Sequence, residues 1–310
     1  MTPPPSWSLA LFTVAQPTFE PLFIASGPLV YRGEDAVRQL AHTNDRKFVV
    51  AGRGIPSVDG NRWQLAQVAE QSHWFKPNGV GRRIADDRNF AHFDRFARYE
   101  PLRGRHFEHA LEIGCGPFTN LRLIADTCSI ESCTLLDPAM NSYLSHRTRY
   151  FDRNNLYVVP PYRSVARAWT RLAPMGRATL GRVSRTVPIR DLLAVGAEES
   201  PATSADLVVM VNVIEHCRDA DQIIDAVKAA VKPGGILVLS DKCYSAEVVA
   251  QRASWVYDQA HPLRVAEAVF RPILDGFRVL FESAIRDVDI EPYYPETFER
   301  YWVLERRFEA

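Results

Sequence analysis

The residues with the clearest chemical meaning lie in the stretch E-I-G-C-G at 112–116, between a β-rich run and a helical pattern. Gly114 and Gly116 have no Cβ, so the backbone of this turn can approach a ligand closely, and the helix that follows offers free N–H groups. Asp137 ends the next β-rich run, where a doubly wound fold places a carboxylate that binds ribose hydroxyls. The combination predicts a nucleoside-cofactor site.

Two classes of cofactor compete for this geometry. A dinucleotide site uses a third glycine so that the helix packs closely beneath a pyrophosphate, whereas this sequence has Thr119 at that point, preceded by Pro117 and Phe118. Glu112 is expected to face the loop, where its negative charge suits a cationic ligand and repels a pyrophosphate. The sequence therefore favours a positively charged cofactor, and a nicotinamide-dependent oxidoreductase remains the alternative.

The elements expected around this turn alternate between strand and helix. We expect an α/β fold with a Rossmann-like, doubly wound, mostly parallel seven-stranded sheet that ends in an antiparallel C-terminal edge hairpin. Strands are expected at 109–113, 133–137, 183–187, 206–211, 236–240, 277–283 and 300–307, with helices at 118–126 and 219–231. The connection before 183 is long and rich in arginine, typical of a solvated insertion or of a face for an anionic substrate.

The first hundred residues have a different texture. Short extended pieces, including one at 46–54, precede two helical patterns at 59–75 and 86–99. Both patterns space aromatic residues at three to four positions, which predicts a buried stripe in preference to a substrate lid. We expect an N-terminal accessory or cap region at 1–100 and a cofactor-binding domain at 101–310.

The composition excludes several classes of protein. Lys plus Arg equals Asp plus Glu at 37 each, so no net positive field attracts nucleic acid or an anionic membrane. No run is long and apolar enough to cross a bilayer and no signal peptide is evident, so we expect a cytoplasmic protein without nucleic-acid or membrane partners. The 5 cysteines show no C-x-x-C spacing, which predicts buried, reduced thiols. The oligomeric state is left open, a homodimer being one option.

The glycine turn, Asp137 and the run 204–242 together resemble the class I S-adenosylmethionine-dependent methyltransferases. The resemblance covers about residues 106–310 and implies S-adenosylmethionine as cofactor. Adenine recognition departs from the family pattern, because no acidic residue follows the third expected strand at once, and backbone groups near Ile189 are the substitute. Carried over by position, the implied cofactor-binding residues are Glu112, Gly114, Cys115, Gly116, Asp137, Pro138, Ile189, Asn212, Val213 and Glu215.

Two histidines are the candidates for the chemistry. Methyl transfer from a sulfonium is an in-line displacement, and a base is needed when the acceptor is a hydroxyl. His216 follows the fourth expected strand, and His261 lies in the segment after the fifth, which in the family often lines the acceptor pocket. The alternatives are a capping or loop role for His216 and the start of a helix for His261.

No metal is expected, because Asn212 replaces the first acid of the E-x-x-E-H motif with which some related O-methyltransferases bind a divalent ion. The sequence thus predicts methylation of a small molecule at oxygen, such as a sugar or secondary metabolite. The alternatives are the NAD-dependent oxidoreductase and a non-catalytic partner protein with the same fold.

Overall fold

The computed structural model describes the fold of most of the C-terminal two thirds and separate parts of the N-terminal third. The described residues are 48–50, 63, 66–67, 70–71, 74, 88–145, 150–158, 183, 185–200, 204–244, 261–265, 267–286 and 297–308. The expected extended pieces before 48, and most of the arginine-rich connection, lie outside these residues.

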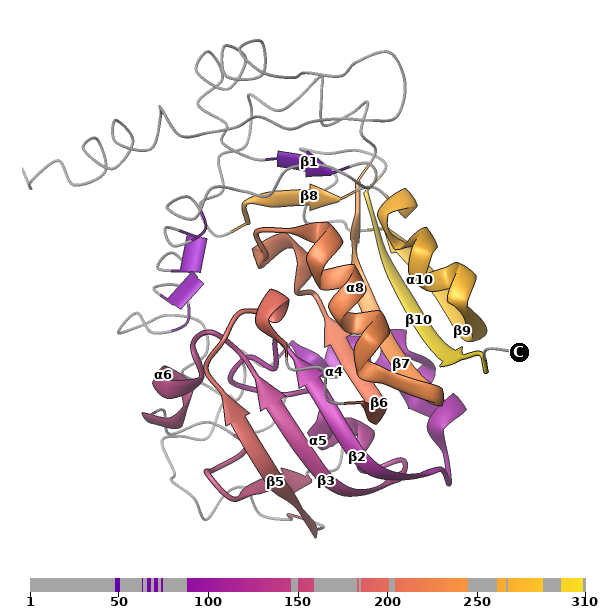
Figure 1. The fold of residues 1–310 in the computed structure, drawn as a ribbon. Coiled ribbons are helices and arrows are strands. Elements are labelled where there is room, and N and C mark those ends of the chain that lie inside the picture. Colours follow the sequence, from indigo (N-terminus) through magenta and orange to yellow (C-terminus); the bar gives the residue numbers. More distant parts are fainter. Residues whose placement is uncertain are drawn as a thin grey trace, which may run out of the picture.

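A mostly parallel sheet forms the centre of the molecule (Figure 1). Its eight strands, in spatial order, are β4 (Asn155–Val158), β5 (Arg185–Leu193), β3 (Ser129–Leu136), β2 (His106–Ile113), β6 (Ala205–Val211), β7 (Val231–Cys243), β10 (Phe298–Arg306) and β9 (Phe277–Arg286). The five strands from β5 to β7 are parallel, and β10 pairs antiparallel with both β7 and β9. The expected α/β class and antiparallel C-terminal hairpin are confirmed.

The expected count of seven strands is wrong by one. The additional strand, β4, pairs antiparallel with β5 and lies inside the long connection before residue 183. Its side chains alternate in burial, with Leu156 and Val158 fully buried, so the pattern is that of an edge strand. A run of four residues among many arginines is too short to stand out in the sequence.

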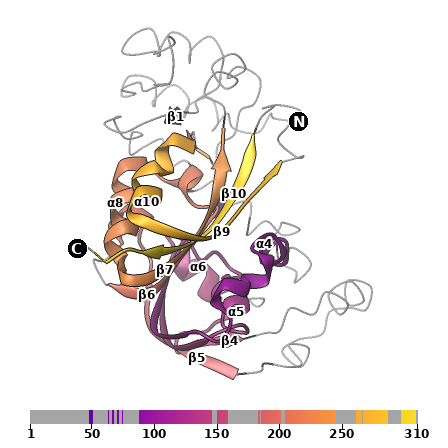
Figure 2. The same cartoon turned by 90° about the vertical axis from the view of Figure 1, so that its right-hand side faces the viewer.

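Helices cover both faces of the sheet (Figures 1 and 2). One face carries α8 (Ala220–Ala230) and α10 (Arg271–Gly276), and the other carries α4 (Asn89–Arg95), α5 (Leu121–Ile124) and α6 (Met140–Ser145). Each face has its own buried apolar cluster, one built around α8 and the other around α4 and α5. Short 3-10 turns complete the fold: η2 (Ala97–Leu102), η4 (Ala197–Glu199), η5 (Ile214–His216) and η6 (Glu267–Phe270).

Local signals explain how α8 begins. Asp219 precedes the helix in an extended conformation, and its carboxylate accepts the N–H of Gln222 at 2.9 Å, so it caps the helix as such residues commonly do. Ile223, Ile224 and Val227 then place an apolar stripe on the sheet. The expected start at 219 is therefore confirmed to within one residue, and the helix ends one residue early, at Ala230.

Two expected helices are shorter than their sequence patterns. The pattern at 86–99 is helical only to Arg95, because Ala97, Arg98 and Tyr99 adopt φ values of 49, 60 and 55°. The pattern at 118–126 is reduced to α5, since the residues before it form the turn of the glycine loop. Of the expected stripe Phe90, Phe93, Phe96 and Ala97, Phe93 and Phe96 are buried and Phe90 is partly buried, whereas Ala97 is exposed because it follows the end of the helix.

The N-terminal part of the chain reaches the C-terminal half through a small second sheet. Strand β1 (Phe48–Val50) pairs in parallel with β8 (Leu263–Val265). The described positions 63, 66–67, 70–71 and 74 are helical, in agreement with the helix expected at 59–75. The domain boundary near residue 100 stays a prediction.

Other expectations concern the cysteines and the membrane. All five cysteines are buried and unpaired, as expected. Among the described residues, no helix has the length and apolar character needed to cross a bilayer.

A substitution in β7 tests directly whether this strand lies in the core. Leu239 is fully buried, so Leu239→Ala should lower the free energy of unfolding by about 2–5 kcal/mol through lost burial and a residual cavity. Val279 on β9 is 46% exposed, and Val279→Ala should change the same quantity by about 0.5 kcal/mol or less. Urea unfolding of both variants measures the difference. Equal effects at the two positions would contradict the described core.

Candidate functional site

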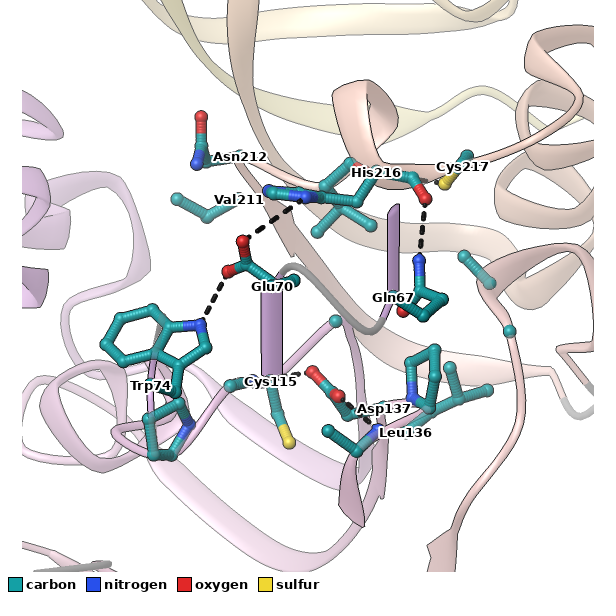
Figure 3. Close-up of a pocket in the computed structure, with 18 of the residues that line it drawn as sticks. Gln67, Glu70, Trp74, Cys115, Leu136, Asp137, Val211, Asn212, His216 and Cys217 are labelled. Carbon is teal, nitrogen blue, oxygen red and sulfur yellow. Dashed lines mark hydrogen bonds and ion pairs between the residues drawn. The ribbon is translucent and has the colours of Figure 1, made fainter. Parts of the chain in front are cut away.

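A cavity of about 470 Å³ opens at the carboxyl ends of β2, β3 and β6. Ligands of open α/β sheets bind at this edge, and the volume lies in the range of small-molecule sites. Its walls come from the glycine turn, the start of α6, the loop after β6, and the helical positions between 63 and 74 (Figure 3).

The two glycines of the turn differ in what a side chain would contact at each position. Both have positive φ, +67° at Gly114 and +56° at Gly116. A Cβ on Gly114 would lie 2.5 Å from Val213 Cγ2, so the loop after β6 can pack against this position only because it has no side chain. A Cβ on Gly116 would meet nothing within 4 Å, and Gly116 lines the cavity. Space beside Gly116 is therefore left for a ligand.

Asp137 stands directly after β3 and lines the cavity beside Cys115 and Pro138. One carboxylate oxygen accepts the N–H of Gly116 at 3.0 Å and the other accepts the N–H of Ala139 at 2.8 Å. Burial raises its pKa to about 6, although these two hydrogen bonds act in the opposite direction. The carboxylate thus fixes the glycine turn and keeps free lone pairs for hydroxyl groups of a ligand.

Glu112 corrects an expectation. Its carboxylate is 1% exposed, is not among the described residues that line the cavity, and accepts the N–H groups of Asn120 at 2.7 Å and Leu121 at 3.2 Å. The Thr119 hydroxyl donates to it as well. The N–H groups at the start of α5 need hydrogen-bond acceptors, and Glu112 supplies them. Burial raises the pKa of Glu112 to about 7. Glu112 therefore shapes the loop instead of facing a ligand.

The loop after β6 is held by an acid that the sequence analysis missed. Asp241, near the end of β7, is fully buried and accepts the N–H groups of Val213 at 3.1 Å and Ile214 at 2.8 Å. Asn212 and Val213 line the cavity, as expected. The only sequence signal for Asp241 is an acid that directly follows a strongly apolar run.

Two asparagines leave buried acceptors at the cavity. The side-chain oxygens of Asn120 and Asn212 are buried and have no hydrogen-bond partner among the described residues. Both residues line the cavity, and Asn212 has φ of 57°. Because a buried carbonyl oxygen without a partner costs free energy, both are suited to accept hydrogen bonds from a ligand.

Glu215 is also placed differently from the expectation. Its carboxylate is 1% exposed, outside the described cavity lining, and bonds to Tyr244 Oη at 2.5 Å, Lys242 Nζ at 3.3 Å and Arg264 Nη1 at 3.1 Å. Burial alone would raise its pKa, but the charges of Lys242 and Arg264 hold the pKa of Glu215 well below its usual range. It joins η5 to β8 and does not contact the space for a cofactor.

Ile189 is the third correction. The sequence places it after a strand that ends at 187, whereas β5 continues to Leu193, so Ile189 lies inside the strand. Its N–H donates to the carbonyl of Asn154 at 2.8 Å, and it is not among the described lining residues. Its N–H is therefore not available for adenine in this arrangement.

The two candidate histidines lie together in the cavity. The ring centroids of His216 and His261 are 4.4 Å apart, although their segments are separate in the chain. A strand, β8, follows His261, so the alternative of a helix start is wrong. Glu70, which the sequence analysis did not assign to the site, brings its Oε2 to 3.9 Å from His216 Nδ1.

The helical positions between 63 and 74 form one wall of the cavity (Figure 3). Trp63 Nε1 and Gln67 Nε2 each donate to the carbonyl of His216 at 3.0 Å. Trp74 Nε1 donates to Glu70 Oε1 at 2.5 Å. The aromatic stripe expected in the core therefore lines the cavity at Trp63 and Trp74. The sequence signal for this role is the polar pair Gln67 and Glu70, which lies at helical spacing between the two tryptophans.

Comparison with known proteins agrees with this architecture. The family profile described as "Methyltransferase domain" matches residues 82–282, which is more than half of the chain. The chain belongs to this methyltransferase family. The resemblance to the class I S-adenosylmethionine-dependent methyltransferases is confirmed, and with it S-adenosylmethionine as the cofactor.

Several solved structures are similar to this one at low identity. N-methyltransferase NodS from Bradyrhizobium japonicum, crystallised with S-adenosyl-L-homocysteine, shares 17% identity over 78% of this chain and 98% of its own, with a TM-score of 0.45. The [4+2]-cyclase SpnF shares 14% sequence identity over 84% of this chain and 100% of its own, with a TM-score of 0.49. A SAM-dependent methyltransferase from Leishmania major shares 14% sequence identity over 91% of this chain and 95% of its own, with a TM-score of 0.45. No curated protein matches the chain significantly.

The described residues fit the family cofactor. Gly116 leaves open space where a side chain would stand, Asp137 offers a carboxylate for ribose hydroxyls, and Asn212 has an unsatisfied buried oxygen that suits the ammonium group of the methionine part. These features depend on the positions of the chain's own atoms and not on the resemblance.

Substitution of Gly116 tests the space left beside the turn. Gly116→Val should weaken binding of S-adenosylhomocysteine by about tenfold to hundredfold, since its side chain would enter the ligand space. Gly104 is the matched control, because it also has positive φ, +71°, and open space around a Cβ, but lies away from the cavity. Calorimetric titration of Gly116→Val and Gly104→Val separates ligand overlap from backbone strain. Equal affinities would place the ligand elsewhere.

The raised pKa of Asp137 predicts a pH dependence. The carboxyl is ionised above about pH 6 and protonated below it, so cofactor affinity should fall as pH drops from 7.5 to 5, by at most about tenfold per pH unit. The charged form accepts ribose hydroxyls more strongly. Asp137→Asn should bind more weakly and lose this dependence. Dissociation constants across the pH range measure the effect, and parallel curves for the two proteins would remove Asp137 from the site.

Proposed function

We propose that this methyltransferase transfers the methyl group of S-adenosylmethionine to a hydroxyl oxygen of a small molecule, such as a sugar or secondary metabolite. The observation that carries the proposal is the meeting of His216, His261 and Glu70 in the same cavity as the glycine turn. An amine acceptor needs only to be uncharged, whereas a hydroxyl needs help to lose its proton. Proton-accepting groups beside the donor therefore favour oxygen as the acceptor atom.

The residues on the cofactor side have separate tasks. When bound, S-adenosylmethionine supplies a methyl group on a positively charged sulfur. Gly116 leaves room for the ligand, Asp137 accepts hydrogen bonds from ribose hydroxyls, and Asn212 accepts from the ammonium group. Since Asp137 and Asp241 also hold the two loops in place, the donor site is formed before the ligand arrives.

On the acceptor side, His216 is proposed to take the hydroxyl proton. Glu70 orients its ring through the 3.9 Å contact to Nδ1, and the bonds from Trp63 and Gln67 to the His216 carbonyl fix its backbone. Alignment of the nucleophile with the methyl carbon supplies much of the rate acceleration in such a displacement.

Two features support a small acceptor and a soluble setting. Trp63, Trp74 and the helical positions described between them line the same cavity as the glycine turn, and Trp74 contacts Phe118 edge-on at 6.1 Å, an enclosed arrangement that suits a small molecule more than a polymer. The equal numbers of basic and acidic residues give no field for nucleic acid or an anionic membrane. We therefore propose a cytoplasmic enzyme with a small-molecule acceptor.

The buried position of Glu112 bears on the oxidoreductase alternative. Because its carboxylate bonds to the start of α5, its charge no longer argues against a pyrophosphate. Thr119 still does, since its buried side chain occupies the position of the third glycine and bonds to Glu112. The family match also favours methyl transfer.

Turnover of a panel of hydroxylated acceptors tests the proposal, with release of S-adenosylhomocysteine as the readout. On an accepted substrate, His216→Ala should lower turnover by about 100-fold or more while cofactor affinity stays nearly unchanged. His106→Ala is the control, because His106 is exposed and pairs only with Glu131 among the described residues. Full activity of His216→Ala would contradict the proposed role, and cofactor binding without turnover on any acceptor would favour the non-catalytic partner.

A further inference from the structure

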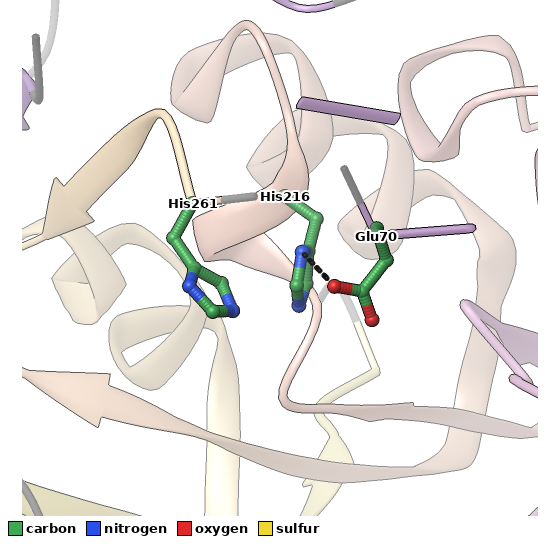
Figure 4. A group of neighbouring side chains, drawn as sticks. All are labelled: Glu70, His216 and His261. Atoms are coloured by element: carbon green, nitrogen blue, oxygen red, sulfur yellow. Dashed lines mark ion pairs between the residues drawn. The ribbon is translucent and has the colours of Figure 1, made fainter. Parts of the chain in front are cut away.

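Three side chains from separate segments converge at the acceptor end of the cavity (Figure 4). Glu70 belongs to the N-terminal helical positions, His216 to η5, and His261 to the segment before β8. Each offers one ligand atom, and these atoms all lie within 4.8 Å of one another.

The geometry points to a binding site for a divalent transition-metal ion of the zinc type, with Glu70, His216 and His261 as its three protein ligands. Its use in catalysis rests on the proposed function, while the binding of the ion does not. The expectation that no metal binds considered Asn212, Glu215 and His216, and the described ligand set shares only His216 with it.

The donor set selects the kind of ion. Two imidazoles and one carboxylate are one of the ligand sets of catalytic zinc sites, which keep a fourth position open for water or substrate. Mg²⁺ prefers several hard oxygen ligands and is poorly served by two imidazoles. A redox-active ion is not required, because methyl transfer consumes no electrons.

The separation of His216 from Glu70 is close to that of a bound site. Zinc bonds to nitrogen and oxygen of about 2.1 Å in a tetrahedral arrangement separate neighbouring ligand atoms by about 3.4 Å. The 3.9 Å between His216 Nδ1 and Glu70 Oε2 is thus longer by less than 1 Å. Small rotations of side chains that are partly exposed would close the group around an ion.

Neighbouring contacts hold two of the three ligands, Glu70 and His216, in place, as in known metal sites. Trp74 Nε1 binds the Glu70 oxygen Oε1, which leaves Oε2 directed at His216. The His216 carbonyl is bonded by Trp63 and Gln67, which lie on the same helical stretch as Glu70.

A second link joins the two histidine-bearing segments. Glu215, next to His216, bonds at 3.1 Å to Arg264, which lies three residues after His261. This ion pair is fully buried, so it fixes the two segments relative to each other.

The proposed ion would act on the acceptor. With the ion bound, His216 would be a ligand and not the base, so the ion would replace it in helping the hydroxyl to lose its proton. The hydroxyl oxygen would bind at the open position, its acidity would rise, and its proton would leave to solvent. An electron pair of that oxygen then forms the bond to the methyl carbon, while the carbon–sulfur bond breaks and its electron pair stays on sulfur. The products are the methyl ether, S-adenosylhomocysteine and one proton, so atoms and charge balance.

Metal binding to the purified full chain, without a histidine tag and after removal of metals with a chelator, tests the inference. Titration with ZnCl₂ should give one site per chain, and Co²⁺ should give the visible absorption of a tetrahedral nitrogen and oxygen site. His261→Ala and Glu70→Gln should each weaken Zn²⁺ binding by about tenfold or more. His106→Ala should bind as the unaltered chain does, and thermal unfolding confirms that each variant is folded.

The outcomes separate this inference from the proposed function. Absence of Zn²⁺ and Co²⁺ binding in a chain that binds S-adenosylhomocysteine would overturn the metal site and leave the methyltransferase intact. Zinc affinity unchanged in both ligand variants would also overturn it, because the ion would then lie elsewhere, for example on a cysteine. Zinc binding that depends on both residues, in a chain that ignores S-adenosylhomocysteine, would support the metal site and contradict the proposed function.

Discussion

A buried carboxylate either accepts hydrogen bonds that stabilise its charge or takes up a proton. This requirement determines the structure of the ligand-binding edge of the sheet. Glu112, Asp137 and Asp241 lie at or just after the ends of β2, β3 and β7, and each accepts at least two backbone N–H groups from nearby turns. The glycine turn, the start of α5 and the loop after β6 therefore have defined positions without a ligand. A cavity whose walls are fixed in this way can bind a cofactor with little reorganisation.

The part of the cavity around His216 and His261 depends on a different buried acid. Glu215 bonds to Tyr244, Lys242 and Arg264, which connects η5, the end of β7 and β8 in one cluster. Such a cluster contributes little to net stability, because desolvation of the charges offsets their attraction. Its consequence is positional: the segments that carry His216 and His261 are brought side by side, and the N-terminal helical stretch completes the group with Glu70.

The sequence predicted what depends on local signals. The glycine turn, Asp137 and the parallel strands follow from residue types at short spacing, and the structure contains all of them. The partners of Glu215, Asp241 and Glu70 lie in distant segments, so their roles could not be derived from spacing. The charge of Glu112 by itself indicates a role at the ligand, but the N–H groups at the start of α5 need acceptors and bind this carboxylate. Strand β4 was missed because four residues in an arginine-rich connection give too weak a pattern.

The central claim is that the cavity beside 114–116 serves a sulfonium donor and not a redox dinucleotide. Isothermal titration of the full chain with S-adenosylmethionine and, separately, with NADH tests it most directly. The claim predicts one site per chain for S-adenosylmethionine and no heat of binding for NADH. Saturable binding of NADH by a folded chain that does not bind S-adenosylmethionine would contradict it.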